Sequence, residues 1–159
     1  ALQEEDLPEL EAEYERLAQY LKDHPETNFF HFNVDLAQGP CVIKRLRGCG
    51  AGCEYVAITP EGDIYPCHQF VGNEEYKLGS VYDGTFDAEL SSRFAGLNIY
   101  TREECRDCWA RFYCSGGCSA SNLLVNGDIK KPHHVGCELE RKRLECAIAL
   151  RAIAAGMAD

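Results

Sequence analysis

The hydrophobic positions of this chain follow different periods in different segments. Between residues 6 and 23, apolar residues recur every three or four positions, and this spacing predicts an amphipathic helix. The pair His24-Pro25 ends the helical pattern, because the residue before a proline disfavours helical backbone angles. Residues 28–36 (NFFHFNVDL) are rich in aromatic and branched side chains, which predicts a β-strand. The chain therefore begins with a helix and a strand, as in part of an α/β pattern.

The middle of the chain carries short strand patterns separated by turn residues. Residues 54–59 and 63–67 flank Pro60-Glu61-Gly62, and this combination predicts a β-hairpin with Gly62 at a positive φ. Residues 76–82 form a weaker strand pattern, and the pair Asp83-Gly84 after them predicts a turn.

Periodicity is lost after residue 100 and returns near the C-terminus. Residues 86–97 predict a short helix, whereas residues 101–136 combine cysteine, glycine and polar residues with little period. That segment must be ordered by something other than a hydrophobic core. A helical pattern resumes over residues 137–155. We expect a small α+β fold with a boundary near residue 37, which divides the chain into residues 1–36 and 37–159.

Composition narrows the classes of function. The formal net charge is −10, whereas nucleic-acid-binding proteins usually carry a basic surface, so nucleic acid is not an expected partner. No run of about 18 apolar residues occurs, so no membrane association is expected. The N-terminal sequence ALQEED is acidic where a signal peptide would be basic, which favours a cytoplasmic location. The chain does not begin with methionine, and we expect it to be processed or truncated.

Ten cysteines are the most informative feature of the composition. In a reducing compartment, so many thiols are more typical of metal ligands than of disulfides. They are Cys41, Cys49, Cys53, Cys67, Cys105, Cys108, Cys114, Cys118, Cys137 and Cys146.

The spacing Cys105-x2-Cys108-x5-Cys114-x3-Cys118 is the strongest metal-binding pattern. Two thiolates separated by two residues can reach one metal centre from a single turn, and the next pair can close on that centre or on a second one. Gly116-Gly117 before Cys118 indicates either a tight turn or a close approach of the backbone to a cluster. Spacing alone suits two iron–sulfur clusters or two structural zinc ions equally, because four-thiolate sites serve both metals.

The remaining cysteines divide by position. Cys137 falls at the predicted start of the last helix, where the helix dipole favours an anionic ligand set. Cys146 lies nine residues further on, on the opposite helix face, and is predicted to be a buried core thiol. Cys49 and Cys67 bracket the hairpin, and Cys41 and Cys53 are each a further ligand, an exposed thiol or a packed one.

These residues resemble a known family. The succession Cys-x(9–15)-Gly-x4-Cys, Cys-x2-Cys-x5-Cys-x3-Cys and a last Cys, over residues 49–137, is similar to the SPASM domain of radical S-adenosylmethionine (SAM) enzymes. The sequences around the cysteines resemble those of the maturases of SCIFF peptides, which are small cysteine-rich precursors. The matching segments are QGPC (38–41), TPEGD (59–63), YPCHQFVG (65–72), CRDCWARFYCSGGC (105–118) and GCELERKR (136–143).

The resemblance implies two auxiliary [4Fe-4S] clusters. By position, the second cluster takes Cys105, Cys108, Cys114 and Cys137. The first takes Cys49, Cys67 and Cys118, and its fourth ligand comes from Cys41, from Cys53 or from a substrate thiolate. Such enzymes form thioether crosslinks from a peptide cysteine to a carbon of another residue, typically threonine, in ribosomally made peptides.

The sequence departs from the family in one respect. The radical SAM signature Cys-x3-Cys-x2-Cys is absent, so this chain alone is not expected to generate a radical. Residues 1–36 would be the last helix and strand of a radical SAM partial barrel, and residues 37–159 a SPASM domain with its C-terminal helix. SAM and a third cluster would belong to a missing N-terminal part. The implied partners are that barrel, a cysteine-rich precursor peptide and an electron donor such as a flavodoxin or ferredoxin. The alternative is a zinc-stabilised protein-interaction module without redox function.

Overall fold

The computed structural model describes residues 2–36 and 46–157. The chain divides into two compact units. Residues 1–40 and 133–159 form one, the helical unit, and residues 41–132 form the other, the cysteine-rich unit. In the described part of the chain, no helix combines the length and the apolar character that crossing a bilayer requires.

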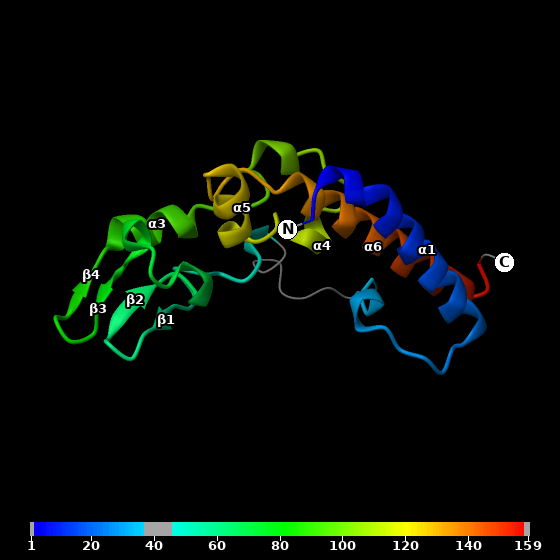
Figure 1. The fold of residues 1–159 in the computed structure, drawn as a ribbon, viewed down its shortest axis with the longest axis horizontal. Coiled ribbons are helices and arrows are strands. Elements are labelled where there is room, and N and C mark those ends of the chain that lie inside the picture. The colour runs from blue at the N-terminus through cyan, green and yellow to red at the C-terminus, as the bar shows by residue number, and fades with distance from the viewer. Residues whose placement is uncertain (1, 37–45, 158–159) are drawn as a thin grey trace. The chain divides into compact units, whose positions relative to one another are not determined.

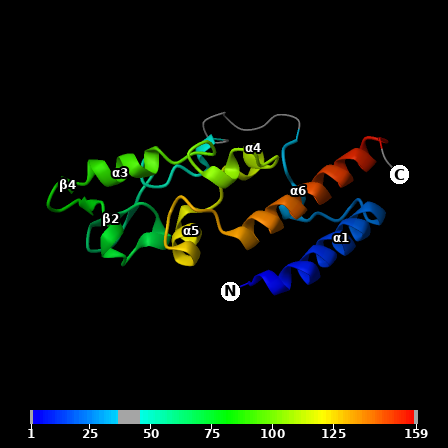
Figure 2. The same ribbon diagram turned by 90° about the horizontal axis from the view of Figure 1, so that it is seen from above.

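The helical unit is built on two long helices that lie side by side (Figures 1 and 2). Helix α1 spans Leu7–Asp23 after a short 3₁₀ turn at Glu4–Asp6, and helix α6 spans His134–Ala154. Lys142 on α6 forms an ion pair with Glu15 on α1. Both helices confirm the predictions from periodicity. Their shared apolar face buries Leu21, Phe32, Cys146 and Ala147.

The strand predicted at residues 28–36 is wrong. The structure has a 3₁₀ turn at Phe30–Phe32, followed by irregular chain to residue 36. The described residues of this unit contain no strand with which the segment could pair. Its aromatic side chains instead pack on the helices, with the Phe32 and Tyr14 ring centroids 5.8 Å apart. Apolar content that fits a strand fits helix packing equally well.

The cysteine-rich unit contains a four-stranded antiparallel sheet with strand order β1-β2-β3-β4. Strands β1 (Ala57–Ile58) and β2 (Asp63–Tyr65) form the predicted hairpin, and Gly62 has a φ of +83° in its turn. Strands β3 (Gly79–Ser80) and β4 (Thr85–Phe86) flank the predicted turn. The sheet thus orders the chain on both sides of Pro66-Cys67.

Two predicted elements of this unit differ in extent. The strand expected at residues 76–82 is reduced to β3, because Glu74–Tyr76 forms a 3₁₀ turn in which Asn73 Oδ1 accepts the Glu75 N–H at 3.2 Å. The helix expected at residues 86–97 is α3 (Ala88–Ala95), capped by Asp87, whose Oδ1 accepts the Leu90 N–H at 2.8 Å.

The core of the cysteine-rich unit lies between the sheet and α3. Phe70, Tyr76 and Phe94 form an aromatic cluster in it, with the Phe70 and Phe94 rings edge to face at 5.4 Å. Leu78 and Leu90 are buried beside them. This core supports the sheet end of the unit without help from the cysteines after residue 100.

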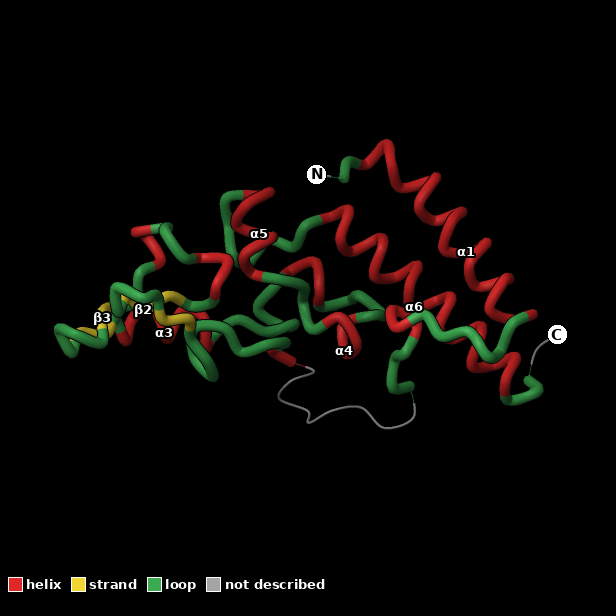
Figure 3. The backbone as a smooth tube through the Cα atoms, turned by 60° about the horizontal axis from the view of Figure 1, so that its bottom comes forward, coloured by secondary structure: helices red, strands yellow, loops and turns green. Residues whose placement is uncertain are grey.

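Residues 96–132 are mostly loop with short helical turns (Figure 3). A 3₁₀ turn at Glu103–Cys105 and helices α4 (Arg111–Cys114) and α5 (Ser119–Asn126) follow one another. Helix α5 was not predicted, because its buried residues are Ala120 and Asn122, which produce no hydrophobic period. The expectation that residues 101–136 lack a core holds for residues 101–118, where Cys105 and Ala110 are the buried apolar residues. It is wrong for the rest of the segment, because Ala120 and Ile129 lie in the core of the cysteine-rich unit.

Candidate metal centre

Nine of the ten cysteines lie in the described residues, and none of the nine is in a disulfide. Cys41, one proposed ligand, lies outside the described residues. The side chains of Cys67, Cys105 and Cys146 are buried. Cys108, Cys114 and Cys137 are half-buried, and Cys49, Cys53 and Cys118 are exposed. Thiols rather than disulfides are what metal ligation requires.

Backbone hydrogen bonds hold the loop of Cys49 against the end of strand β2. The Gly52 N–H donates to the Pro66 carbonyl at 3.0 Å, directly before Cys67. The Gly52 carbonyl in turn accepts the Ser91 hydroxyl from α3 at 2.7 Å. This loop is therefore attached to both the sheet and α3.

Tyr55 links the two cysteines that bracket the hairpin. Its hydroxyl donates to Cys49 Sγ at 4.0 Å. Burial and the neighbouring thiolates of Cys49 and Cys67, both also hydrogen-bonded to it, raise the pKa of Tyr55 to about 12. One phenol thus contacts both thiols, which brings Cys49 and Cys67 to the same place as expected. Cys53 lies close by, and its Sγ donates to the Gly50 carbonyl at 3.4 Å.

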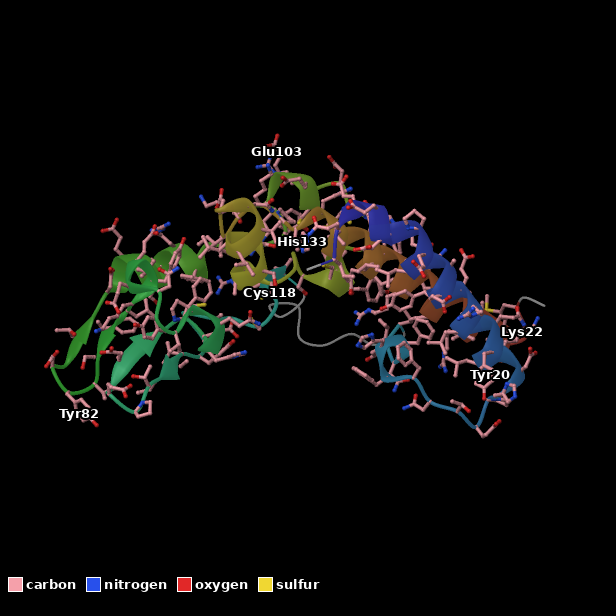
Figure 4. The ribbon with its side chains drawn as sticks, in the orientation of Figure 1. Tyr20, Lys22, Tyr82, Glu103, Cys118 and His133 are labelled. Carbon is pink, nitrogen blue, oxygen red and sulfur yellow. The ribbon has the colours of Figure 1, made fainter. Side chains whose placement is uncertain are left out.

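Tyr55 is expected to remain a hydrogen-bond donor in alkaline solution. At pH 11, a tyrosine with the ordinary pKa is about 90% ionised, whereas Tyr55, whose pKa is raised to about 12, is mostly protonated. Negative thiolates disfavour the phenolate, so its ionisation moves to higher pH. Carbon-13 NMR of ring-labelled tyrosine in the reduced, metal-free protein measures this, and Tyr55→Phe assigns the signal. Tyr82→Phe, at an exposed turn, should leave that signal unchanged (Figure 4). Full ionisation of the assigned signal at pH 11 would contradict the geometry.

Local turns position the cysteines after residue 100. The Cys108 N–H donates to the Cys105 carbonyl at 3.2 Å, and the Cys114 N–H donates to the Ala110 carbonyl at 2.9 Å. Burial raises the pKa of Cys105, Arg102 lowers it, and the charges of Cys114 and Cys108 raise it again. Cys108 and Cys114 therefore each lie within electrostatic range of Cys105.

Cys118 and Cys137 each lie at the start of a helix. Cys118 directly precedes α5 (Figure 4), and Cys137 lies in the first turn of α6, as predicted, where its N–H donates to the His133 carbonyl at 3.0 Å. Cys146 is 5% exposed among the apolar residues of the helical unit, which confirms it as a core thiol.

The described cysteines do not form closed metal sites. Within residues 2–36 and 46–157, no three His, Cys, Asp or Glu side chains converge closely enough to hold one metal ion. Cys137 belongs to the helical unit and the other proposed ligands of the second cluster to the cysteine-rich unit. Both four-ligand sets therefore stay predictions. What the structure adds is that Tyr55 contacts both Cys49 and Cys67, and that the charges of Cys108 and Cys114 reach Cys105.

Sequence reasoning missed two residues beside these thiols, Tyr55 and Arg102. In the sequence, Tyr55 is one residue of a predicted strand, and Arg102 is one polar residue of a segment without periodicity. No motif marks either position. The aromatic side chains between Cys108 and Cys114, those of Trp109, Phe112 and Tyr113, are between about a third and a half exposed.

Comparison with known proteins defines the class. Residues 49–109 match the family model of the SPASM domain, an iron-sulfur cluster-binding domain. This segment of the chain is therefore a SPASM domain, and the resemblance inferred from the cysteine spacing is confirmed there. The donor chemistry fits, because thiolate is the usual ligand of iron–sulfur clusters.

Individual relatives come from bacteria and an archaeon. An uncharacterized protein of Archaeoglobus fulgidus is 31% identical over 101 residues, which cover 61% of this chain and 24% of that protein. The serine-type anaerobic sulfatase-maturating enzyme of Klebsiella aerogenes is 31% identical over 86 residues, which cover 52% of this chain and 20% of that enzyme. The PqqA peptide cyclase of Xanthomonas euvesicatoria is 28% identical over 105 residues, which cover 60% of this chain and 27% of that enzyme. The chain thus matches about a quarter or less of each relative's length.

Proposed function

We propose that this chain is the auxiliary-cluster part of a radical SAM enzyme that modifies a cysteine-rich peptide. The observation that carries the proposal is the SPASM match over residues 49–109. The contact of Tyr55 with both Cys49 and Cys67 supports it. Two relatives are named for maturing a sulfatase and for cyclising a peptide, which supports a peptide or protein substrate. The similarity of the cysteine-flanking segments to SCIFF-peptide maturases supports thioether formation as the reaction.

The proposed ligand sets follow the family pattern. The second cluster takes Cys105, Cys108, Cys114 and Cys137, and the effect of the Cys108 and Cys114 charges on Cys105 supports grouping these three. The first cluster takes Cys49, Cys67 and Cys118, and the shared contact with Tyr55 supports the pairing of Cys49 with Cys67. When bound, such clusters supply single-electron transfer to or from the substrate.

The chain's own residues would hold and protect these groups. Tyr55 stays protonated at neutral pH and can donate to the Cys49 thiolate, which reduces the negative charge on that sulfur. Attachment of the Cys49 loop to β2 and α3 fixes the distance between Cys49 and Cys67 before a metal binds. Oxygen-sensitive clusters and reduced thiols suit a cytoplasmic location.

The fourth ligand of the first cluster decides how a substrate would bind. If it is a substrate thiolate, binding to iron deprotonates and orients that thiol for attack. Replacing both Cys41 and Cys53 by alanine tests this: full cluster content supports a site open to substrate. Loss of the first cluster would assign the ligand to the chain itself.

Anaerobic preparation with metal and sulfide analysis tests the function as a whole. Two [4Fe-4S] clusters give a brown protein with about eight iron and eight sulfide per chain. A colourless, folded protein loaded with zinc would overturn the proposal and support the interaction module instead. Turnover of a cysteine-rich precursor peptide requires the radical SAM barrel and a flavodoxin or ferredoxin as electron donor, and is measured on a chain that includes that barrel.

A further inference from the structure

Arg102 is a buried cation three residues before Cys105. The residue is 3% exposed to solvent. Both terminal nitrogens are anchored: Nη1 donates to the Ile129 carbonyl at 3.0 Å and the Lys130 carbonyl at 3.4 Å, and Nη2 donates to the Ser119 hydroxyl at 3.0 Å. These bonds determine where the guanidinium plane lies.

The third nitrogen of this guanidinium is left over. Arg102 Nε is buried and has no hydrogen-bond acceptor among the described residues. A buried charged donor without an acceptor is costly, and such groups are rare unless something else satisfies them. A purely structural clamp explains the two anchored nitrogens and leaves Nε unexplained.

Gly116 leaves the space that this side chain occupies. A Cβ at position 116 would lie 2.9 Å from Arg102 Cδ and 3.0 Å from Nε. The glycine is buried and lies between Cys114 and Cys118 in the cysteine motif. The backbone of the motif therefore runs directly past the unpartnered nitrogen.

Arg102 contacts residues next to proposed ligands of both clusters. The Cys105 N–H donates to the Arg102 carbonyl at 3.1 Å, and Ser119, whose hydroxyl accepts from Arg102 Nη2, directly follows Cys118. Arg102 forms no salt bridge with a carboxylate in the described residues. Cys105 belongs to the proposed ligands of the second cluster and Cys118 to those of the first.

We propose that Arg102 is a cation shared by the two cluster sites, with Nε–H donating to a cysteinyl or cluster sulfur. The inference rests on the proposed function. A reduced cluster carries one more negative charge than an oxidised one, so a buried cation beside it stabilises the reduced form and raises its potential. Arg102 is a positioning and tuning residue: it acts through the sulfurs and ligates no iron.

Reduction potentials of the intact protein test the proposal. Wild type, Arg102→Met and Arg102→Lys are compared in EPR-monitored redox titrations, after iron and sulfide analysis of each. We expect Arg102→Met to lower the reduction potential of at least one auxiliary cluster. At a fixed solution potential, the ratio of oxidised to reduced cluster should rise tenfold or more, which corresponds to about 59 mV for a one-electron couple. Arg102→Lys keeps the charge and should recover most of that shift.

Two matched variants separate charge from structure. Arg106→Met removes the same charge from an exposed position in the same loop, where solvent screens it, and should change the ratio less than about threefold. Ser119→Ala removes one hydrogen-bond acceptor of Arg102 and keeps the charge, so it should also change the ratio less than about threefold. An unchanged potential in a fully loaded Arg102→Met protein, or equal shifts in Arg106→Met, would overturn the inference.

A second measurement keeps Arg102 itself unchanged. Pulsed EPR of the reduced wild-type protein with ¹⁵N in the arginine guanidinium groups should show nitrogen coupled to a cluster. Arg111→Lys is the control, because Arg111 Nη1 donates to the Cys108 carbonyl at 3.3 Å. Absence of coupling, or its loss in Arg111→Lys, refutes the role of Arg102. Wild-type protein without iron and sulfide would refute the proposed function itself, whereas loaded protein without these effects refutes this inference alone.

Discussion

Replacing both Cys105 and Cys108 by alanine is expected to lower the iron and sulfide content of the anaerobically prepared protein by about half. The two thiols lie in one local turn, linked by the Cys108 N–H to Cys105 carbonyl bond of 3.2 Å, and both belong to the same proposed ligand set. With half of its ligands gone, the second cluster should not assemble, whereas the first keeps Cys49, Cys67 and Cys118. Iron, sulfide and zinc analysis of each variant measures the effect.

Cys146→Ala is the matched control for that double variant. Cys146 is a buried thiol in the core of the helical unit, where it packs with Leu21 and Ala147. Its removal leaves a small cavity and should cost about 1 kcal/mol of stability with no change in iron. A double variant that retained full iron, or a Cys146→Ala protein that lost half of it, would disprove the proposed division of the cysteines.

Removing the metal is expected to unfold residues 101–118 locally. Amides in this segment, such as those of Cys108 and Cys114, should exchange with deuterium about 100-fold or more faster in chelator-treated protein. The physical reason is the scarcity of buried apolar side chains there, since Cys105 and Ala110 are the buried apolar residues among the eighteen positions. Hydrogen exchange with mass spectrometry, on metal-loaded and metal-free protein, measures the difference.

The sheet end of the same unit serves as the internal reference. The Leu78 N–H donates to the Ile64 carbonyl at 2.7 Å, beside the core formed with Phe70 and Phe94. This core does not depend on the later cysteines, so the Leu78 amide should keep most of its protection without metal. Equal protection of residues 101–118 in both forms would show that the segment needs no metal to fold.

Element prediction succeeded where the pattern was long or the turn chemistry was strong. The helices α1 and α6 extend over many turns, so their apolar stripes are clear. The β1–β2 hairpin was predicted because Pro60-Glu61-Gly62 has few other conformations. The 28–36 segment failed because aromatic composition does not distinguish a strand from a turn packed on helices.

The sequence predicted the chemical class of the site, but it did not predict the side chains that lie next to the thiols. Cysteine spacing indicated a metal site, the resemblance to the SPASM domain indicated iron–sulfur, and the family match over residues 49–109 confirms that class. The spacing indicated nothing of Tyr55 or Arg102, because a single phenol or guanidinium in a loop carries no spacing signal. Both became visible only through contacts with residues distant in the chain, such as Arg102 with Ile129.

The sequence by itself determined the number and spacing of the thiols, the two long helices and the hairpin between Cys49 and Cys67. These features depend on local periodicity and on the chemistry of single residue types. Only the tertiary structure decided that residues 28–36 pack as a turn, that Tyr55 contacts two thiols and that Arg102 is buried. Burial and hydrogen bonding of a polar side chain depend on groups brought together from separate segments, and no local pattern encodes that environment.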